Sequence, residues 1–567
     1  WTRKVHCGAQ CRLWRSEKDL PSAGKFNTFL GLNIANSPQY TITTEWASDH
    51  RNWGIIIGVI MIAMAIGNYW GGHQADKKPS YLRLYSELFF AGVWIVLVPF
   101  FGRFVIGGVS LLFALIVKKN LVIWASLFSS IILFVPPLLF VGKVTPSLIK
   151  YSLEEKVSGK VIGVLEALNT FGSIIGTFLP TFLTIPFIGT SISFVLFGSM
   201  IAVLGLLYIV TYYIDYFKTK RKKQLINEKS DVAENKPKKE KIHVKSCVFS
   251  GILSLLWIAG IVLSSNASPV FWKDDTILVE TDSMYNYLKV SKEGKTTYFS
   301  TNVLFGVQSC INDDFSLTGM YYDTFLVSPF LVREKPEVLV LGNGTGSYAT
   351  MMKDYLHCDC NITAVEIDQK IIDLSYKYFK MNKDVNVVCD DGRNFISRSK
   401  DMYDIILVDA YSSISAPFHM TTTEFFTLVK DHLNDDGLMM MNVNMRSDNK
   451  GSISEALCDT AYGVFDNLVE INSSSGMEVF ASKNKDKDLI KEVNNVVREH
   501  PEISSGLKYT FSKLGMNLTK HVDNGTRLFD DTADVEMRSI KTLDVIVQEE
   551  LAQIKEQGFS ELISSLF

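Results

Sequence analysis

The sequence has little cysteine and no excess of charge of either sign. Its 567 residues include eight Cys, too few for a fold held together by disulfides. Cys358 and Cys360 have no second cysteine pair at zinc-binding spacing, so we expect no metal site. The 57 Lys and Arg balance 60 Asp and Glu to a net charge of −3, which excludes the basic surface that nucleic-acid phosphates require.

Residues 1–50 also lack the basic and apolar segments of a secretory signal. They are polar and predict an irregular N-terminal segment. Because the chain begins with Trp1 instead of Met, we expect a fragment or a processed form.

Long apolar runs, by contrast, are abundant before residue 265. A helix that crosses a bilayer needs about 20 mostly apolar residues. Six runs come close to or exceed that length: 53–72, 84–102, 121–141, 161–183, 191–217 and 246–264. Run 104–117 has only 14 residues and fits a short crossing, a re-entrant segment or part of its neighbour. The runs predict a multi-pass integral protein of the cell membrane, with an α-helical transmembrane bundle over 51–217 and a last transmembrane helix over 246–264.

The charged residues of this half bear on function and orientation. Glu87 and Glu166 lie at or within apolar runs, where a carboxylate belongs either to a transport or proton site or is an interfacial or paired carboxylate. The linker 218–245 holds 11 basic and four acidic residues, and the loops 71–83 and 142–160 are also basic. The positive-inside rule places all three in the cytoplasm if the 14-residue run does not cross, and the last helix then carries the rest of the chain out.

From residue 336 the pattern becomes that of an α/β fold. The predicted elements are a buried strand over 337–341, a glycine-rich turn over 342–346, a helix over 347–356 and a strand over 362–365. The second strand leads into Glu366, 20 residues after Gly346. A glycine turn between strand and helix lets the backbone approach a nucleoside ligand, and an acid at this distance binds the ribose hydroxyls. The pattern predicts a nucleoside cofactor.

Acidic residues also follow later predicted strands. Asp390 and Asp391 follow strand 385–389, and Asp409 follows strand 403–408. A further strand over 438–443 comes after a predicted helix over 422–433. Carboxylates at several strand ends point into the crevice where open α/β sheets bind ligands. Helix N-capping explains one such acid but hardly the whole set. The spacing alone does not exclude a nicotinamide cofactor for hydride transfer.

The order of these signals resembles the S-adenosylmethionine-type fold and, more closely, the spermidine synthase family, from about residue 279 to residue 536. The matching segments are 283–286, 306–309, 313–315, 321–323, 342–346, 365–368, 391–392 and 403–409. The loop 71–78 and the segment 142–146 resemble half of a major facilitator transporter. The whole chain resembles fused proteins with such a half-transporter ahead of a spermidine synthase-like domain, and segments 416–426 and 530–536 look typical of that group.

The resemblance implies a small β-region over 276–330 and a Rossmann-like, S-adenosylmethionine-methyltransferase-like domain over 331–567. The family transfers an aminopropyl group from decarboxylated S-adenosylmethionine to a small amine, and Asp409 would be the base. The implied cofactor-binding residues are Asn286, Gly342, Gly344, Gly346, Glu366, Asp391 and Gly392. The implied substrate-binding residues are Gln308, Tyr322, Asp323, Thr345 and Ser412. His419 is interpreted as structural in preference to a ligand or base.

Three of these positions depart from the family pattern. Thr345 and Ser412 stand where the family has acids, and Tyr322 stands where it usually has His. Because a diamine carries two positive charges that need paired carboxylates, the diamine site is altered and the acceptor stays open.

The sequence is compatible with three functions. The first is a membrane-anchored aminopropyltransferase, the second a membrane-bound methyltransferase that uses S-adenosylmethionine, and the third a non-catalytic polyamine or nucleoside sensor or transporter subunit. The expected partners are the lipid bilayer and a small amine, with self-association left open and nucleic acid excluded. Charge counting places the enzyme domain outside the cytoplasm, whereas both cofactors are made inside it.

Overall fold

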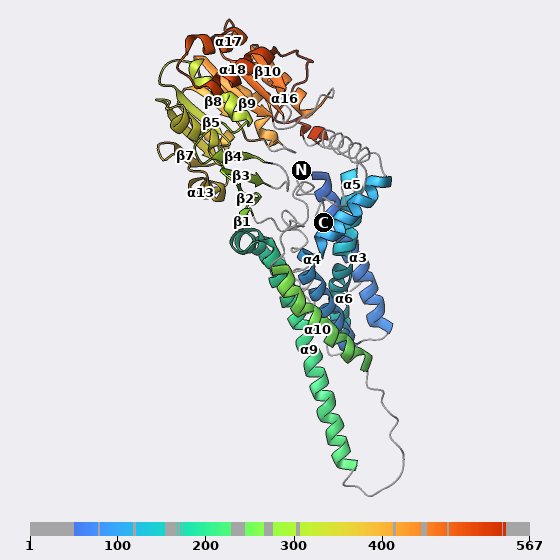
Figure 1. The fold of residues 1–567 in the computed structure, drawn as a ribbon. Coiled ribbons are helices and arrows are strands. Elements are labelled where there is room, and N and C mark those ends of the chain that lie inside the picture. The colour runs from blue at the N-terminus through green and yellow to red at the C-terminus, as the bar shows by residue number, and fades with distance from the viewer. Residues whose placement is uncertain are drawn as a thin grey trace. The chain divides into compact units, whose positions relative to one another are not determined.

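The structure is a computed structural model that describes residues 50–77, 80–116, 121–153, 167, 170–172, 174–227, 244–265, 276–301, 307–411, 416–443, 451–472, 476–535 and 537–539. The chain divides near residue 270 into a helical unit and an α/β unit, each of which is described by itself (Figure 1). Several sequence predictions lie outside the described residues: those on 1–49, on Glu166 and on Ser412.

The helical unit is built from long apolar helices. They are α3 (His50–Lys77), α4 (Tyr81–Ile116), α5 (Leu121–Gly142), α6 (Val144–Leu153), the π-turn η1 (Pro180–Thr184), α8 (Ile185–Ile188), α9 (Thr190–Asn227) and α10 (Val244–Ser265). Within the described residues, five stretches are long and apolar enough to cross a membrane: Gly54–Lys77, Tyr81–Ser110, Ile123–Lys150, Thr170–Ile188 and Thr190–Thr219. The apolar part of α10 is shorter, Phe249–Ser265.

The doubtful run 104–117 is part of its neighbour. α4 continues without a break through Arg103, the charged residue that separates the two apolar runs in the sequence. The guanidinium carbon of Arg103 lies 4.9 Å from the ring centre of Phe104, so the charged group is covered on one side by an aromatic face. One continuous helix satisfies the condition under which the three basic loops share one side of the membrane.

Glycines bring the helices of this unit into close contact. A Cβ atom on Gly205 of α9 would lie 2.7 Å from the backbone nitrogen of Phe89 on α4. A Cβ atom on Gly92 of α4 would lie 2.7 Å from the carbonyl oxygen of Gly198. Such close backbone approach supplies the van der Waals contact that holds helices together where lipid surrounds them.

Glu87 on α4 is a paired carboxylate. Its Oε1 lies 3.3 Å from Nζ of Lys143, which directly follows α5 and is only 2% exposed. The same Nζ lies 3.7 Å from the ring centre of Trp70 on α3. Glu87 is therefore a paired carboxylate in the structure. It supplies the negative charge that the buried ammonium of Lys143 needs.

The α/β unit begins with a four-stranded antiparallel meander. Its strands are β1 (Ile277–Asp282), β2 (Tyr287–Glu293), β3 (Thr296–Thr301) and β4 (Ser309–Asn312), in that order. Leu288, Val290 and Phe299 pack from the meander against Ile371 and Leu374 of α13 (Gln369–Tyr378). This packing and a hydrogen bond from Ser283 to Asp368 attach the meander to the larger sheet.

The larger sheet has eight strands in the order β12-β10-β11-β9-β8-β5-β6-β7. The five strands β5 to β9 run parallel to one another, whereas β11 pairs antiparallel with β9 and β10, and β12 pairs antiparallel with β10. The strands are β5 (Glu337–Leu341), β6 (Asn361–Glu366), β7 (Asn386–Cys389), β8 (Tyr403–Val408), β9 (Leu433–Val443), β10 (Leu468–Asn472), β11 (Met477–Ser482) and β12 (Thr519–Lys520). The predictions of strands over 337–341 and 403–408 are confirmed to the residue.

Helices flank this sheet. They are α11 (Tyr321–Phe325), α12 (Ser347–Thr350) with the π-turn η3 (Met351–Tyr355), α14 (Gly392–Arg398), α15 (Thr423–Asp431), α16 (Ile453–Phe465), α17 (Leu489–Glu499) and α18 (Ser505–Asn517), with the short 3-10 turns η2 (Ser328–Phe330) and η4 (Phe418–Met420). Alternate residues of β5 enter two different cores, Val338 and Val340 in one, Leu339 and Leu341 in the other. Burial on both faces explains why this strand is apolar at every one of these positions.

Candidate active site

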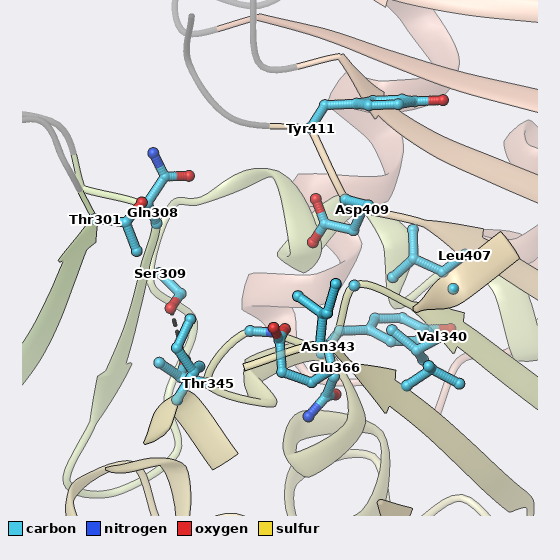
Figure 2. A pocket seen from close by; sticks show the side chains of 18 of the residues that line it. Thr301, Gln308, Ser309, Val340, Asn343, Thr345, Glu366, Leu407, Asp409 and Tyr411 are labelled. Carbon is cyan, nitrogen blue, oxygen red and sulfur yellow. Dashed lines mark hydrogen bonds between the residues drawn. The ribbon is translucent and has the colours of Figure 1, made fainter. Parts of the chain in front are cut away.

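A cavity of about 420 Å³ lies where the carboxyl ends of the parallel strands face the meander (Figure 2). It brings together most of the residues proposed from the sequence: Asn286, Gln308, Tyr322, Gly342, Gly344, Thr345, Glu366, Asp391, Gly392 and Asp409. Gly346 and Asp323 are not among its lining residues. The strand ends meet at one edge because β5, β6, β7 and β8 are parallel.

The glycine-rich turn after β5 forms part of the cavity wall. Gly342 has φ +91°, and a Cβ atom there would lie 2.6 Å from the carbonyl oxygen of Asp409. Gly346 has φ +78°, and a Cβ atom there would collide with the sulfur of Met381, so this glycine serves packing. Asn343 lines the cavity, and its buried carboxamide has no hydrogen-bond partner among the described residues.

Glu366 is the last residue of β6, and it is held by the backbone. Its Oε2 accepts a hydrogen bond of 2.7 Å from the Gly344 amide, and its Oε1 accepts one of 3.1 Å from the Asp368 amide. Burial, the largest effect, raises the pKa of Glu366 to about 7, although these hydrogen bonds lower it. The carboxylate keeps lone pairs for a hydroxyl pair such as that of a ribose.

Two of the strand-end acids cap helices. Asp368 Oδ1 accepts a hydrogen bond from the Lys370 amide at the start of α13, and Asp391 Oδ1 accepts one from the Asn394 amide in α14. Capping therefore explains Asp391 among the strand-end acids named from the sequence, and also Asp368, which lies two residues beyond the end of β6. Asp391 also has a second contact, because its Oδ2 lies 3.0 Å from Nε2 of His419. Both side chains line the cavity, so capping does not remove Asp391 from the site.

Asp409 follows β8 directly and is held by two donors. The hydroxyl of Tyr321 donates to its Oδ2 at 2.5 Å, and the carboxamide of Asn442 on β9 donates to its Oδ1 at 2.9 Å. Burial, the largest effect, raises the pKa of Asp409 to about 7, while both hydrogen bonds lower it. Burial and the nearby Asp409 raise the pKa of Tyr321 well above 10, so its phenol stays a donor.

The side chains opposite Asp409 are neutral. Thr345 Oγ1 lies 2.6 Å from Ser309 Oγ, which belongs to β4. Tyr322 is buried with its hydroxyl donating to the Cys310 carbonyl oxygen at 2.5 Å. Outside the cavity lining, the carboxylate of Asp323 accepts hydrogen bonds from the Thr318 and Gly319 amides at 2.8 and 2.6 Å. Asp323 thus stabilises the turn that leads into α11.

Sequence reasoning missed Tyr321 and Asn442. Tyr321 stands inside segment 321–323, which matches the family, but the resemblance implies roles only for its neighbours Tyr322 and Asp323. Asn442 is the penultimate residue of the predicted strand 438–443, a position next to a strand end that could have drawn attention to it. Neither residue is close to Asp409 in the sequence, and only the pairing of β8 with β9 and the placement of α11 bring them together.

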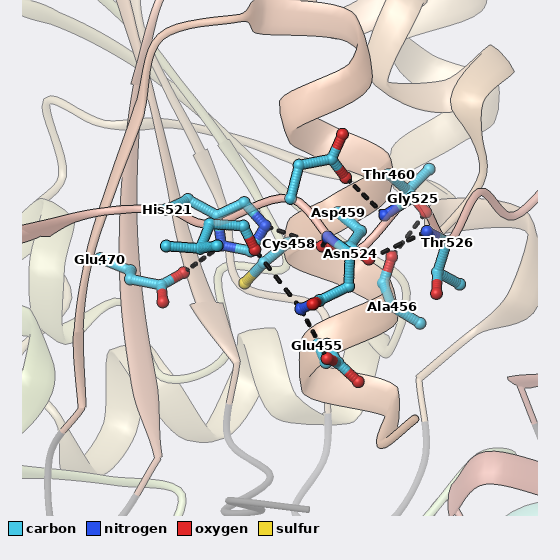
Figure 3. A network of polar contacts seen from close by, with 12 residues as sticks. Glu455, Ala456, Cys458, Asp459, Thr460, Glu470, His521, Asn524, Gly525 and Thr526 are labelled. Atoms are coloured by element: carbon cyan, nitrogen blue, oxygen red, sulfur yellow. Dashed lines mark hydrogen bonds and ion pairs between the residues drawn. The ribbon is translucent and has the colours of Figure 1, made fainter. Parts of the chain in front are cut away.

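A second polar cluster lies away from the cavity (Figure 3). Cys458, Glu470 and His521 present metal-ligand atom types close together. Both ring nitrogens of His521 are taken, however, Nδ1 by Glu470 at 2.7 Å and Nε2 by Asp459 at 2.9 Å. Asp459 also accepts a hydrogen bond from the Thr526 amide at 2.9 Å. The cluster therefore acts as a clamp between α16, β10 and the segment that follows β12.

That segment reaches the rim of the cavity. Asp530 forms two hydrogen bonds of 2.6 Å with the guanidinium of Arg393 on α14. Arg393 in turn donates to the carbonyl oxygen of His419 at 2.6 Å. These contacts fix the loop that carries His419 beside Asp391, which agrees with a structural role for His419.

Comparison with known proteins identifies the family to which the chain belongs. Residues 323–470 match the spermine/spermidine synthase domain. A protein of Bifidobacterium longum named "probable polyamine aminopropyl transferase" is 39% identical over 342 residues, which cover 57% of this chain and 75% of the relative. The chain belongs to the polyamine aminopropyltransferase family. It is accordingly a transferase with a spermidine synthase-like C-terminal part.

Other members of the aminopropyltransferase family match over shorter stretches. A polyamine aminopropyltransferase of Buchnera aphidicola is 32% identical over 142 residues, 24% of this chain and 48% of the relative. The crystal structure of spermidine synthase from Thermotoga maritima is 20% identical, covers 41% of this chain and 80% of that chain, and has a TM-score of 0.33.

Proposed function

We propose that the α/β unit transfers an aminopropyl group from decarboxylated S-adenosylmethionine to an amine acceptor, with Asp409 as the base. The observation that carries this proposal is the placement of Asp409. It lies in the cavity wall between two donors, Tyr321 and Asn442, which hold both of its oxygens. A pKa near 7 suits a base that must be ionised before the reaction and take a proton during it.

The chemistry follows from an amine and a sulfonium. A protonated amine has no lone pair with which to attack, so a carboxylate must remove its proton. The free amine nitrogen then forms a bond to the methylene carbon next to the sulfonium, and the carbon–sulfur bond breaks with its electron pair staying on sulfur. Methylthioadenosine leaves, and the proton remains on Asp409. Holding the two reactants in line supplies much of the acceleration.

The other end of the cavity suits the nucleoside. Glu366 would accept hydrogen bonds from the ribose hydroxyls, and Asp391 would accept one from the adenine amino group. Asn286 lines the same end, because the turn 283–286 is tied to Asp368 through Ser283. Gly344 leaves room for the ligand beside the backbone, because a Cβ atom there would meet nothing within 4 Å. Gly342 instead lets the turn pack closely against the Asp409 carbonyl oxygen.

The helical unit would anchor the enzyme in a bilayer, as half of a major facilitator transporter would. Large apolar side chains on its helices face outward: Ile62, Phe187 and Leu255 are 61%, 79% and 70% exposed. Water would not tolerate this many exposed apolar groups, whereas lipid would. Extraction of membranes at high pH tests the anchor, since an integral protein stays in the pellet and release into the supernatant would contradict it.

The products distinguish the proposed reaction from its main rival. Detergent-solubilised full-length protein is incubated in parallel with decarboxylated S-adenosylmethionine and with S-adenosylmethionine, each with an amine mixture. Methylthioadenosine from the first cofactor supports aminopropyl transfer. S-adenosylhomocysteine from the second would show a methyltransferase instead, and tight nucleoside binding without either product would favour a sensor.

A further inference from the structure

One wall of the cavity is uncharged. Thr301, Gln308 and Ser309 lie across from Asp409 (Figure 2). Ser309 and Thr345 share a hydrogen bond of 2.6 Å, and Thr345 Oγ1 lies 3.2 Å from Ser347 Oγ. The wall therefore offers hydroxyl and amide groups to a ligand and no formal charge.

The carboxylates of the cavity are concentrated at the nucleoside end. Four acids line it among the described residues, and three of them, Glu366, Asp390 and Asp391, stand at the ends of β6 and β7. Asp390 is paired with Arg398, and Asp391 with His419. Asp409 is left as the one acid of the lining that follows β8.

Two short segments that adjoin lining residues in the sequence contain no acid. Residues 302–306, which precede Gln308, read Asn-Val-Leu-Phe-Gly, and residues 412–415, which follow Tyr411, read Ser-Ser-Ile-Ser. The carboxylate of Asp323 is outside the lining and is taken up by the Thr318 and Gly319 amides. Among the described residues that line the cavity, Asp409 is thus the single carboxylate outside the ends of β6 and β7.

We propose that the acceptor is an amine with one positive charge at its reacting end and an uncharged polar group, such as a hydroxyl or an amide, at its far end. The proposal rests on the aminopropyl transfer proposed above. The donor already brings a sulfonium and a primary ammonium to this half of the cavity. A second ammonium on the acceptor would be buried against hydroxyl groups without a carboxylate, which is strongly unfavourable. A hydroxyl in its place can exchange hydrogen bonds with Ser309 and Thr345.

The test compares two acceptors of equal length. Full-length protein in detergent receives decarboxylated S-adenosylmethionine with either 1,4-diaminobutane or 4-amino-1-butanol, which differ only in the far group. The expected result is a kcat/KM for the amino alcohol about ten- to a hundredfold above that for the diamine, the range of a charge-assisted hydrogen bond. A kcat/KM for the diamine equal to or above that of the amino alcohol would overturn the proposal.

A variant tests the same point from the side of the protein. Thr345→Asp places an acid on the neutral wall and is expected to move the preference toward the diamine by about ten- to a hundredfold, whereas Thr345→Ser keeps the hydroxyl and the original preference. A Thr345→Asp protein that binds methylthioadenosine normally but keeps the preference for the amino alcohol would contradict the proposal. Methylthioadenosine formation with neither acceptor nor any other amine would refute aminopropyl transfer itself, while transfer that favours the diamine refutes only this inference.

Discussion

Removal of the Tyr321 hydroxyl should shift the pH dependence of the reaction. In Tyr321→Phe, Asp409 loses a donor at 2.5 Å while its burial stays the same. A hydrogen bond to a charged group contributes about 1.5 to 3 kcal/mol, and one pKa unit corresponds to about 1.4 kcal/mol. The pKa of Asp409, about 7 in the parent protein, should therefore rise by about one to two units.

The base must be ionised, so the acidic limb of kcat/KM against pH should move upward by the same one to two units. Activity near pH 7 falls and recovers in alkaline buffer. Tyr322→Phe is the matched control, since the Tyr322 hydroxyl donates to the Cys310 carbonyl oxygen and not to Asp409. An unmoved limb in Tyr321→Phe, or an equal movement in both variants, would refute the role given to Tyr321.

Three further predictions concern stability and topology. Gly342→Ala should lower the free energy of unfolding by about 2 kcal/mol or more, because the residue has a positive φ and its Cβ atom would collide with the Asp409 carbonyl oxygen after β8. Gly344→Ala is the control and should lower it by about 1 kcal/mol, because its φ is also positive but its Cβ atom would meet nothing within 4 Å. Equal losses in thermal melts would contradict this reasoning. Although burial, the largest effect, lowers the pKa of His521, the hydrogen bonds and charges of Glu470 and Asp459 outweigh it and raise the pKa. The stability that His521 contributes should be complete below about pH 6.5 and lost as the pH rises through the folded-state pKa. The melting temperature of the parent should therefore fall more over this range than that of His521→Gln. An equal fall in both proteins would contradict the role of the clamp. Protease added to intact cells decides between the two expectations for sidedness. Digestion of the chain after residue 265 is the result that the positive-inside rule predicts, because the basic loops would then share the cytoplasmic side and α10 follows them. Protection until lysis is the result expected if the enzyme unit lies in the cytoplasm, where both cofactors are made.

The sequence signals are strong where one local pattern decides the structure. Strands β5 and β8 are apolar runs bounded by glycine or aspartate, and both were predicted to the residue. β9 begins at Leu433, five residues before the prediction, because Asn-Asp-Asp-Gly over 434–437 has the composition of a turn. In the structure these residues interrupt the regular pairing of β8 with β9. Between two consecutive paired positions, β8 moves on by two residues, from Tyr403 to Ile405, whereas β9 moves on by five, from Leu433 to Leu438.

The candidate site was predictable at its strand ends and less so between elements. A strand-end aspartate looks the same in sequence whether it caps a helix, binds a ligand or does both, and Asp391 lines the cavity while capping α14. The two partners of Asp409 come from α11 and β9, far away in the chain. Their convergence depends on strand order, which no local spacing encodes.

The most direct test of the central claim is the product balance of Asp409→Asn beside the parent protein. Both full-length proteins receive decarboxylated S-adenosylmethionine and an amine. We expect the parent to form methylthioadenosine and aminopropylated amine in equal amounts, and the variant to bind the nucleoside normally but turn over about a hundredfold more slowly or worse. Undiminished turnover by Asp409→Asn would contradict its role as the base, and parent protein that releases no methylthioadenosine with any amine would contradict the reaction.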